Sequence, residues 1–218
     1  MLPQHCLLCT APAATRPLCD DCHAQLPRLT AWRCPQCATP TGQGELCGAC
    51  IAKPPAFASV SAAYVYAWPL ATLIQQFKYA GNLALTRLLA EAMCAAGPPE
   101  VDLIIPMPLA PARLRERGFN QALELARIAG AATRTRIDAR AIRRVRDSAP
   151  QAMLPWRERA KNIRGAFVFD TDLSGLRIAV VDDVITTGAT LNELARTLRK
   201  AGASEIHGWM VARTLKRD

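Results

Sequence analysis

Residues 178–190 read Ile-Ala-Val-Val-Asp-Asp-Val-Ile-Thr-Thr-Gly-Ala-Thr, and this stretch decides the fold. The apolar, mostly β-branched run at 178–181 predicts a strand buried on both faces of a parallel sheet. Asp182 and Asp183 follow at the carboxyl end of that strand, where open α/β sheets bind their ligands. Residues 186–190 are hydroxyl-bearing or small, so the backbone N–H groups of this loop can close on an anion.

A helix is predicted directly after this loop. From Leu191 onwards, apolar residues recur at i, i+3, i+4 and i+7, which is one helix face. We expect Thr190 to cap this helix, with Glu193 completing a capping box. Because a loop that leads into a helix N-terminus is suited to phosphate, the acids and the loop together favour a phosphorylated sugar as ligand. The alternative is a solvated Asp-Asp pair in an ordinary turn, but adjacent carboxylates repel each other unless something binds them. No Gly-Lys-Ser/Thr follows the loop, so a Walker A motif is excluded.

The first 50 residues contain four Cys-x-x-Cys pairs. The last two pairs repeat the first two with a displacement of 28 residues, which indicates an internal duplication. Each half is expected to hold one structural zinc ion through four thiolates, giving two zincs. The predicted ligands are Cys6, Cys9, Cys19, Cys22, Cys34, Cys37, Cys47 and Cys50. The duplication favours pairing within each half, and a cross-braced arrangement is the alternative.

A disulfide-stapled secreted module is the rival interpretation of these cysteines. The amino-terminal residues lack a signal-peptide pattern, and closely spaced Cys-x-x-Cys pairs are typical of metal sites in a reducing compartment. We therefore expect a cytoplasmic protein. No apolar run reaches the roughly 18 residues of a membrane span.

The net charge of +9 comes from one part of the 218-residue chain. Residues 110–164 hold 14 basic and 5 acidic residues, and nearly all of the basic ones are arginine. The guanidinium fork suits phosphate groups, so the partner of this segment could be a pyrophosphate or a nucleic-acid backbone. A solvated basic face is the alternative.

The order of elements predicts an α/β domain with a parallel sheet flanked by helices. Residues 52–56 form the expected linker between a small four-cysteine zinc-ribbon module (residues 1–53) and this domain (residues 56–218). Strands are expected at 58–66, 101–108, 137–145, 167–169 and 205–212, besides the one at 178–181. Helices are expected after Pro69 and before Gly97, and Asn120 is expected to cap another.

The loop after the strand at 101–108 is basic. In a parallel sheet it opens at the same edge as Asp182. Arg113 and Arg117 in this loop are therefore candidates for facing the diphosphate of a ligand whose sugar lies at the acidic pair. Lys78, at a predicted helix end, is either a charge favoured by the helix dipole or a further ligand contact.

The run at 178–190 resembles the phosphoribosyl pyrophosphate (PRPP) motif of type I phosphoribosyltransferases. Taken with the cysteine pairs, Arg-Gly-Phe-Asn-Gln at 117–121, Pro-Gln-Ala at 150–152 and Gly-Ala-Phe at 165–167, the chain resembles the ComF family (competence protein F, or GntX-like). That family joins a double zinc ribbon to a type I phosphoribosyltransferase-like domain. The resemblance covers nearly the whole chain.

The resemblance implies a site that binds PRPP, or a related phosphosugar, with magnesium. Asp182 and Asp183 would bind the ribose hydroxyls and act in catalysis if the protein turns over. The 5-phosphate would be held by Thr186, Thr187, Gly188, Ala189 and Thr190. The loop from Met107 to Arg117 would hold the pyrophosphate. Residues 147–155 would form a mobile loop, and Gln151 and Arg159 would belong to a closing region.

Three functions follow from the resemblance and the residues. The first is a protein of DNA uptake in natural transformation, with single-stranded DNA and a competence helicase-type protein as partners. The second is a working phosphoribosyltransferase, a glycosyltransferase acting on an unidentified base, although no residue stands out as a general base. The third is a regulator that senses PRPP. We favour the first.

Overall fold

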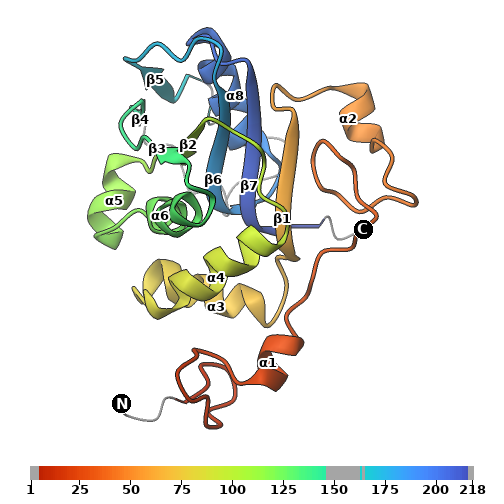
Figure 1. The fold of residues 1–218 in the computed structure, drawn as a ribbon, viewed down its shortest axis with the longest axis vertical. Coiled ribbons are helices and arrows are strands. Elements are labelled where there is room, and N and C mark those ends of the chain that lie inside the picture. The colour runs from red at the N-terminus through yellow and green to blue at the C-terminus, as the bar shows by residue number, and fades with distance from the viewer. Residues whose placement is uncertain (1–4, 146–162, 164, 216–218) are drawn as a thin grey trace.

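The computed structural model describes residues 5–145, 163 and 165–215. Its centre is a five-stranded sheet in the order β1-β7-β6-β2-β3, in which every neighbouring pair is parallel (Figure 1). The strands are β1 (Ser59–Val65), β2 (Leu103–Pro106), β3 (Arg136–Ile137), β6 (Arg177–Ile185) and β7 (Glu205–Arg213). The expected parallel sheet is therefore confirmed.

Helices cover both faces of this sheet. One face carries α3 (Leu70–Tyr79), α4 (Ala84–Ala95) and α6 (Gln121–Thr133), and the other carries α8 (Ala189–Lys200). On β6, Ile178 and Val180 pack into the core beneath α8, whereas Ala179 and Val181 pack into the core beneath α4 and α6. Since all four are buried, the prediction of a strand covered on both faces is confirmed.

The two cysteine-rich repeats pack against different layers of the domain. The first ribbon, which includes α1 (Asp20–Ala24), places Leu18 and Leu26 in the core shared with α3 and α4. The second ribbon, which includes α2 (Gly48–Ala52), places Cys34 and Ala38 in the core shared with α8. Figure 1 shows the two ribbons well apart, the first in red and the second in orange. The chain between them runs beside β1, where backbone bonds join residues 27 and 29 to residues 65 and 63.

The strand expected at 137–145 is wrong in its extent. β3 ends at Ile137, and Asp138 then turns the chain by accepting hydrogen bonds from the backbone N–H groups of Arg140 and Ala141. A separate strand, β4 (Ile142–Arg144), pairs antiparallel with β5 (Phe167–Phe169) in a two-stranded sheet outside the main one. The expected loop at 147–155, with Gln151, and the position of Arg159 lie outside the described residues.

The segment after β2 starts with a short helix. The helix α5 (Pro111–Arg117) follows β2 and ends at Gly118, which has a left-handed backbone. Within the described ranges, no helix is long and apolar enough to cross a membrane.

Candidate ligand-binding site and zinc centres

The carboxyl ends of β2 and β6 form the switch point of the sheet. After β2 the chain passes through α5 and α6 to β3 on one side, and after β6 it passes through α8 to β7 on the other. The loops that follow these two adjacent strands therefore diverge and leave a crevice, which is the place where open α/β sheets bind ligands. A cleft of about 510 Å³ lies there.

Most of the predicted ligand residues line this cleft. They are Met107, Arg113, Arg117, Asp182, Asp183, Thr186, Gly188, Ala189 and Thr190. Thr187 does not line it; its Oγ1 atom instead accepts a hydrogen bond from the Ala189 N–H at 3.0 Å. The fold thus brings the loop after β2 together with the acidic pair and the loop at 186–190, which lie far from it in the sequence.

The acidic pair lies within β6 and not after it, because the strand continues to Ile185. β2 pairs with β6 only as far as Pro106 opposite Val181, whereas β7 pairs with β6 to its end. Beyond Val181, β6 therefore lacks a neighbouring strand on the β2 side. Asp182 and Asp183 occupy the strand where this edge opens into the cleft.

Asp183 forms a buried ion pair with Lys78 at the end of α3. Lys78 Nζ lies 2.6 Å from Asp183 Oδ2, and the two side chains are 19% and 3% exposed. Apart from this contact with Lys78, Asp183 Oδ2 has no hydrogen-bond partner in the described chain. Burial lowers the pKa of Lys78, but the charge of Asp183, its side-chain contact with Lys78 and the charge of Asp182 together outweigh burial and raise that pKa above its ordinary value. Lys78 therefore stays protonated beside the Asp183 carboxyl.

Asp182 behaves differently from its neighbour. Burial, together with the negative charge of Asp183, raises the pKa of Asp182 to about 8, although Lys78 opposes the shift. The Asp182 carboxyl can therefore hold a proton near neutral pH. A hydrogen bond from the Asp183 N–H to Asp182 Oδ1 at 2.9 Å fixes the orientation of this carboxyl.

The turn into α8 depends on Gly188 and not on the predicted capping box. Gly188 is the N-cap and has φ 77°, a left-handed conformation that favours glycine. The predicted partner Glu193 does not bond back to the N-cap; its Oε1 accepts a hydrogen bond from the Gly165 N–H at 2.8 Å. The cap at Thr190 is therefore wrong by two residues. The helix N-terminus still opens on the cleft, where its dipole favours an anion.

Asn120 connects the loop after β2 to the following helix. Its Oδ1 accepts a hydrogen bond from the Ala122 N–H at 3.0 Å, which confirms the predicted cap of α6. Its Nδ2 donates to the Met107 carbonyl at 3.1 Å. One side chain thus fixes both ends of the segment that carries Arg113 and Arg117.

The two arginines of that segment differ in their partners. Arg113 is paired with Glu116 at 2.8 Å on the same helix. The guanidinium of Arg117 stacks 5.0 Å from the ring centroid of Tyr79, and its Nη2 donates to the Tyr79 hydroxyl at 3.4 Å. Arg117 Nε is buried without a hydrogen-bond partner in the described chain. Both guanidinium groups border the cleft as positive charge opposite the carboxylates.

Sequence reasoning missed several residues of the cleft wall. Gln75 and Tyr79 lie one helical turn apart on α3 and both line the cleft. Gln121 is 4% exposed, and its Oε1 has no partner within the described residues. The position of Gln121 at the end of the Arg-Gly-Phe-Asn-Gln run could have indicated that it belongs to the site. The sequence had no corresponding signal for the pairing of Lys78 with Asp183, because tertiary packing creates it.

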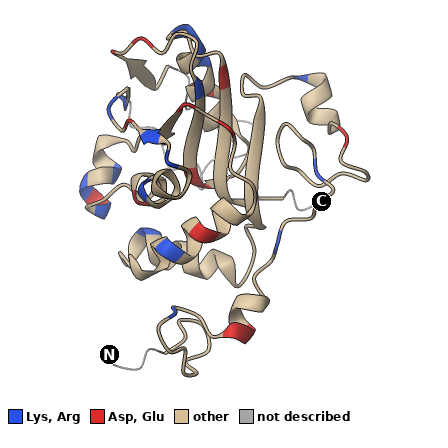
Figure 2. Cartoon of the chain, in the orientation of Figure 1, with Lys and Arg blue, Asp and Glu red and all other residues tan. Residues whose placement is uncertain are grey.

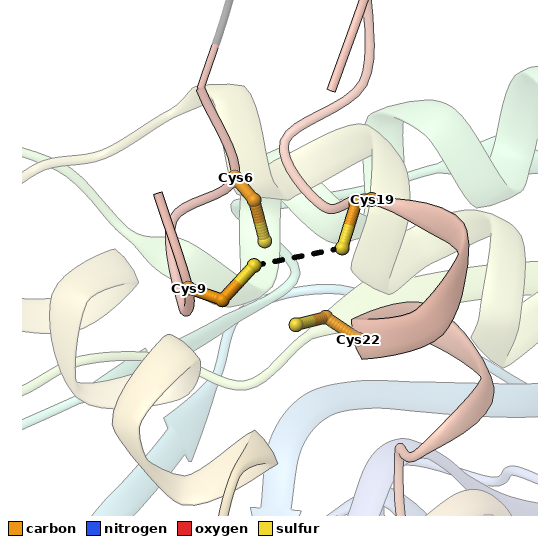
Figure 3. Close-up of side chains that lie close together, drawn as sticks. All are labelled: Cys6, Cys9, Cys19 and Cys22. Carbon is orange, nitrogen blue, oxygen red and sulfur yellow. Dashed lines mark hydrogen bonds between the residues drawn. The ribbon is translucent and has the colours of Figure 1, made fainter. Parts of the chain in front are cut away.

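The eight cysteines gather into two sets of four, as the duplication predicts. The sets are Cys6, Cys9, Cys19 and Cys22, and Cys34, Cys37, Cys47 and Cys50. Within each set the sulfur atoms all lie within 4.8 Å of one another. Figure 3 shows the first set converging from a loop and from the start of α1. The pairing is within each half, so the cross-braced alternative is excluded.

The spacing of the sulfur atoms fits zinc. Cys9 Sγ and Cys19 Sγ are 3.6 Å apart, as are Cys37 Sγ and Cys47 Sγ. Tetrahedral coordination with Zn–S bonds of about 2.3 Å would place neighbouring sulfurs about 3.8 Å apart. A disulfide would require about 2.0 Å, and all of these cysteines are free. Each half is a four-cysteine zinc site.

The basic residues of the middle segment do not form one uniform surface. Several are paired with carboxylates, such as Arg127 with Glu124 and Arg143 with Asp170. Figure 2 shows basic and acidic segments alternating along α5. Arg144 lies at the cleft, which it lines, and its guanidinium stacks on the ring of Phe167.

Comparison with known proteins identifies the family. A model described as a double zinc ribbon domain matches residues 1–51. The DNA utilization protein YhgH of Salmonella typhi is 36% identical, with 98% of this chain and 99% of the relative covered. Competence protein F of Haemophilus influenzae is 33% identical, with 90% of each chain covered. The chain belongs to the ComF family.

This ComF-family protein also aligns with a solved structure of another class. The glutamine PRPP amidotransferase of B. subtilis is 18% identical with a TM-score of 0.43, and the alignment covers 62% of this chain and 30% of the other. Because that score is low, the fold assignment rests on the sheet itself. A parallel sheet with helices on both faces and its cleft at the switch point is the expected phosphoribosyltransferase-like architecture, here joined to two zinc ribbons.

Proposed function

We propose that this ComF-family protein binds PRPP with magnesium in the cleft between β2 and β6. One observation carries the proposal: the switch point joins a carboxylate pair, a helix N-terminus and two arginines around one cavity. A ligand with vicinal hydroxyls at one end and several phosphate oxygens at the other matches that arrangement of charge.

Each part of the ligand has a counterpart in the cleft. Asp182 and Asp183 accept hydrogen bonds from the ribose hydroxyls. Residues 186–190 surround the 5-phosphate with hydroxyls and backbone N–H groups at the start of α8. Arg113 and Arg117 face the pyrophosphate. Magnesium, a hard cation, suits carboxylate and pyrophosphate oxygens and would neutralise the charge that these groups share.

The relatives' names connect this family with DNA utilization and competence. We therefore propose that PRPP binding serves the handling of DNA, with single-stranded DNA as a partner and with a competence helicase-type protein as a further one. Arg144, which borders the cleft beside Phe167, supports a nucleic-acid contact close to the phosphosugar site.

A second candidate function is transfer of the phosphoribosyl group to a nitrogen base. The raised pKa of Asp182, at about 8, favours it, because a general base works best when its pKa lies near the operating pH. In this reaction the base nitrogen forms a bond to the anomeric carbon as the bond from that carbon to pyrophosphate breaks. Asp182 accepts the proton that the nitrogen releases.

Calorimetric titration of PRPP and magnesium into the zinc-loaded protein tests the proposal. The Asp182→Asn variant should lose binding, whereas Asp20→Asn, an exposed carboxyl on α1, should bind like the wild type. Absence of binding by the wild type would overturn the proposal. Release of pyrophosphate only when an acceptor base is added would establish the second candidate function.

A further inference from the structure

The side chain of Arg213 lies between the second zinc ribbon and the loop at 186–190. It is 7% exposed although it carries a charge. Its Nη2 donates a hydrogen bond to Thr39 Oγ1 at 2.8 Å, and its Nη1 donates to the Thr186 carbonyl at 3.2 Å. Thr39 belongs to the second ribbon and Thr186 begins the proposed phosphate loop. One buried guanidinium therefore contacts both.

Thr39 connects this guanidinium to a zinc ligand. Its Oγ1 lies 3.2 Å from Cys37 Sγ. With zinc bound, Cys37 is a thiolate, which accepts a hydrogen bond and cannot donate one. The Thr39 hydroxyl then donates to the sulfur, and its lone pairs face Arg213. Four thiolates around one Zn²⁺ carry net negative charge, which a buried cation offsets.

At its other end, Arg213 sets the direction of a peptide group. The peptide bond between Thr186 and Thr187 is trans, since Trp68–Pro69 is the cis bond of the described chain. In a trans peptide the carbonyl and the following N–H point in opposite directions. While Arg213 holds the Thr186 carbonyl, the Thr187 N–H points away from Arg213. Loss of that contact allows the peptide to turn its carbonyl, which repels phosphate, toward the anion.

The first ribbon lacks this connection. The residue 28 positions before Thr39 is Ala11, which has no hydroxyl. The first ribbon packs into the core beneath α3 and α4, whereas the second packs into the core that contains Ile185 and Leu191 on either side of the loop. Within the described residues, the duplicated ribbons therefore differ in a contact that reaches the candidate site.

We propose that Arg213 is a positioning residue for the phosphate loop and that the second zinc ribbon, unlike the first, is part of the PRPP site. The inference rests on the proposed function for its ligand. Zinc in the second ribbon fixes Thr39, Thr39 and Thr186 fix Arg213, and Arg213 fixes the first peptide of the loop. Zinc in the first ribbon has no such effect.

The first test uses variants that keep all the zinc ligands. Thr39→Val removes the hydroxyl, and Arg213→Lys keeps the charge but loses the fork that spans two acceptors. Hydrogen exchange at residues 187–190, without ligand, should become faster in both variants, while zinc content stays at the wild-type value. PRPP affinity should fall about tenfold, the loss expected for a positioned hydrogen bond. Thr133→Val, which removes a hydrogen-bonded hydroxyl on α6, is the matched control and should change neither property.

The second test compares the ribbons directly. Cys47→Ser and its counterpart Cys19→Ser should each lower zinc content by about one ion per chain. Only Cys47→Ser should speed exchange at residues 187–190. Equal effects of both variants, or unchanged exchange in Thr39→Val, would overturn the inference. If the wild type fails to bind PRPP, the proposed function fails, but the exchange measurements still decide whether the second ribbon supports the loop.

Discussion

Lys78 Nζ lies 2.6 Å from Asp183 Oδ2, and this ion pair joins the end of α3 to the acidic strand end of β6. Removing the cation leaves a carboxyl that is 3% exposed without its charged partner. We expect Lys78→Met to lower the free energy of unfolding by about 3 kcal/mol, because a buried charge then lacks its partner. Urea denaturation measures the change.

The exposed ion pair between Arg87 and Glu91 on α4 is the matched control. Its side chains are 82% and 58% exposed. Arg87→Met should therefore leave the free energy of unfolding close to the wild-type value. Equal losses in the two variants would show that the pair at the cleft contributes no more than a surface pair.

Asp182→Asn should make the protein more stable at alkaline pH while removing PRPP binding. The pKa of Asp182 is about 8 in the folded protein, against an ordinary value of 3.8. Between these values the folded state keeps a proton that the unfolded state has released, so this carboxyl lowers stability as pH rises from about 4 to about 8. The variant loses that dependence. Urea denaturation at pH 4 and pH 8 should show the larger gain at pH 8.

A loss of stability at pH 8 in Asp182→Asn would contradict this reasoning. The combination of higher stability and lost binding is expected of a residue held in an unfavourable environment for function. A residue that serves only the fold would show lower stability.

Gly188→Ala should weaken both the fold and the site. Gly188 has φ 77°, and a Cβ there would lie 3.7 Å from Ile185 Cδ1, so space is available and the backbone alone opposes the change. We expect a loss of about 1 kcal/mol and weaker PRPP binding, because the turn into α8 shifts. Thermal unfolding and calorimetry measure the two effects.

Gly48→Ala provides the comparison for this glycine. Gly48 begins α2 and its backbone is not left-handed. A Cβ added to Gly48 would meet no neighbouring group within 4 Å. Alanine should leave stability unchanged or raise it by up to about 1 kcal/mol, with PRPP binding unaffected. If the two alanine variants behave alike, the left-handed turn is not what the loop requires.

Metal analysis should give about two zinc ions per chain, and Cys22→Ser should lower the value to about one. Each set of four sulfurs is separate, so damage to the first should leave the second intact. A fall to zero in Cys22→Ser would show that the two sites depend on each other. An unchanged value of two would remove Cys22 from the ligand set.

The sequence predicted the features that local pattern and spacing determine. The buried strand at 178–181, the cap at Asn120 and the two cysteine sets follow from periodicity, side-chain chemistry and repetition. The features it missed depend on neighbours that are distant in the chain. Pro106 ends the pairing on one side of β6, and this opens the edge at Asp182. The helix cap lies at Gly188, and Glu193 bonds to the distant backbone N–H of Gly165 instead of closing a capping box.

The extent of the strand expected at 137–145 also could not be predicted from the apolar pattern alone. Its apolar content fits a strand, but the Asp138 side chain satisfies two backbone N–H groups and so competes with continued pairing. The sequence shows only the total positive charge of the middle segment, whereas in the structure Arg127 and Arg143 are each paired with a carboxylate. Composition gives the total charge but not the surface on which it lies.

The packing of the ribbons against opposite layers means that duplication has produced two copies that are no longer interchangeable. Each copy keeps the same four-sulfur frame, yet Leu18 in the first and Ala38 in the second face different halves of the molecule. A chimaera that carried the first ribbon twice would preserve every zinc ligand and still lack the surface that fits beneath α8. The shared spacing of the cysteines indicates a common origin, whereas the residues between the cysteines have diverged.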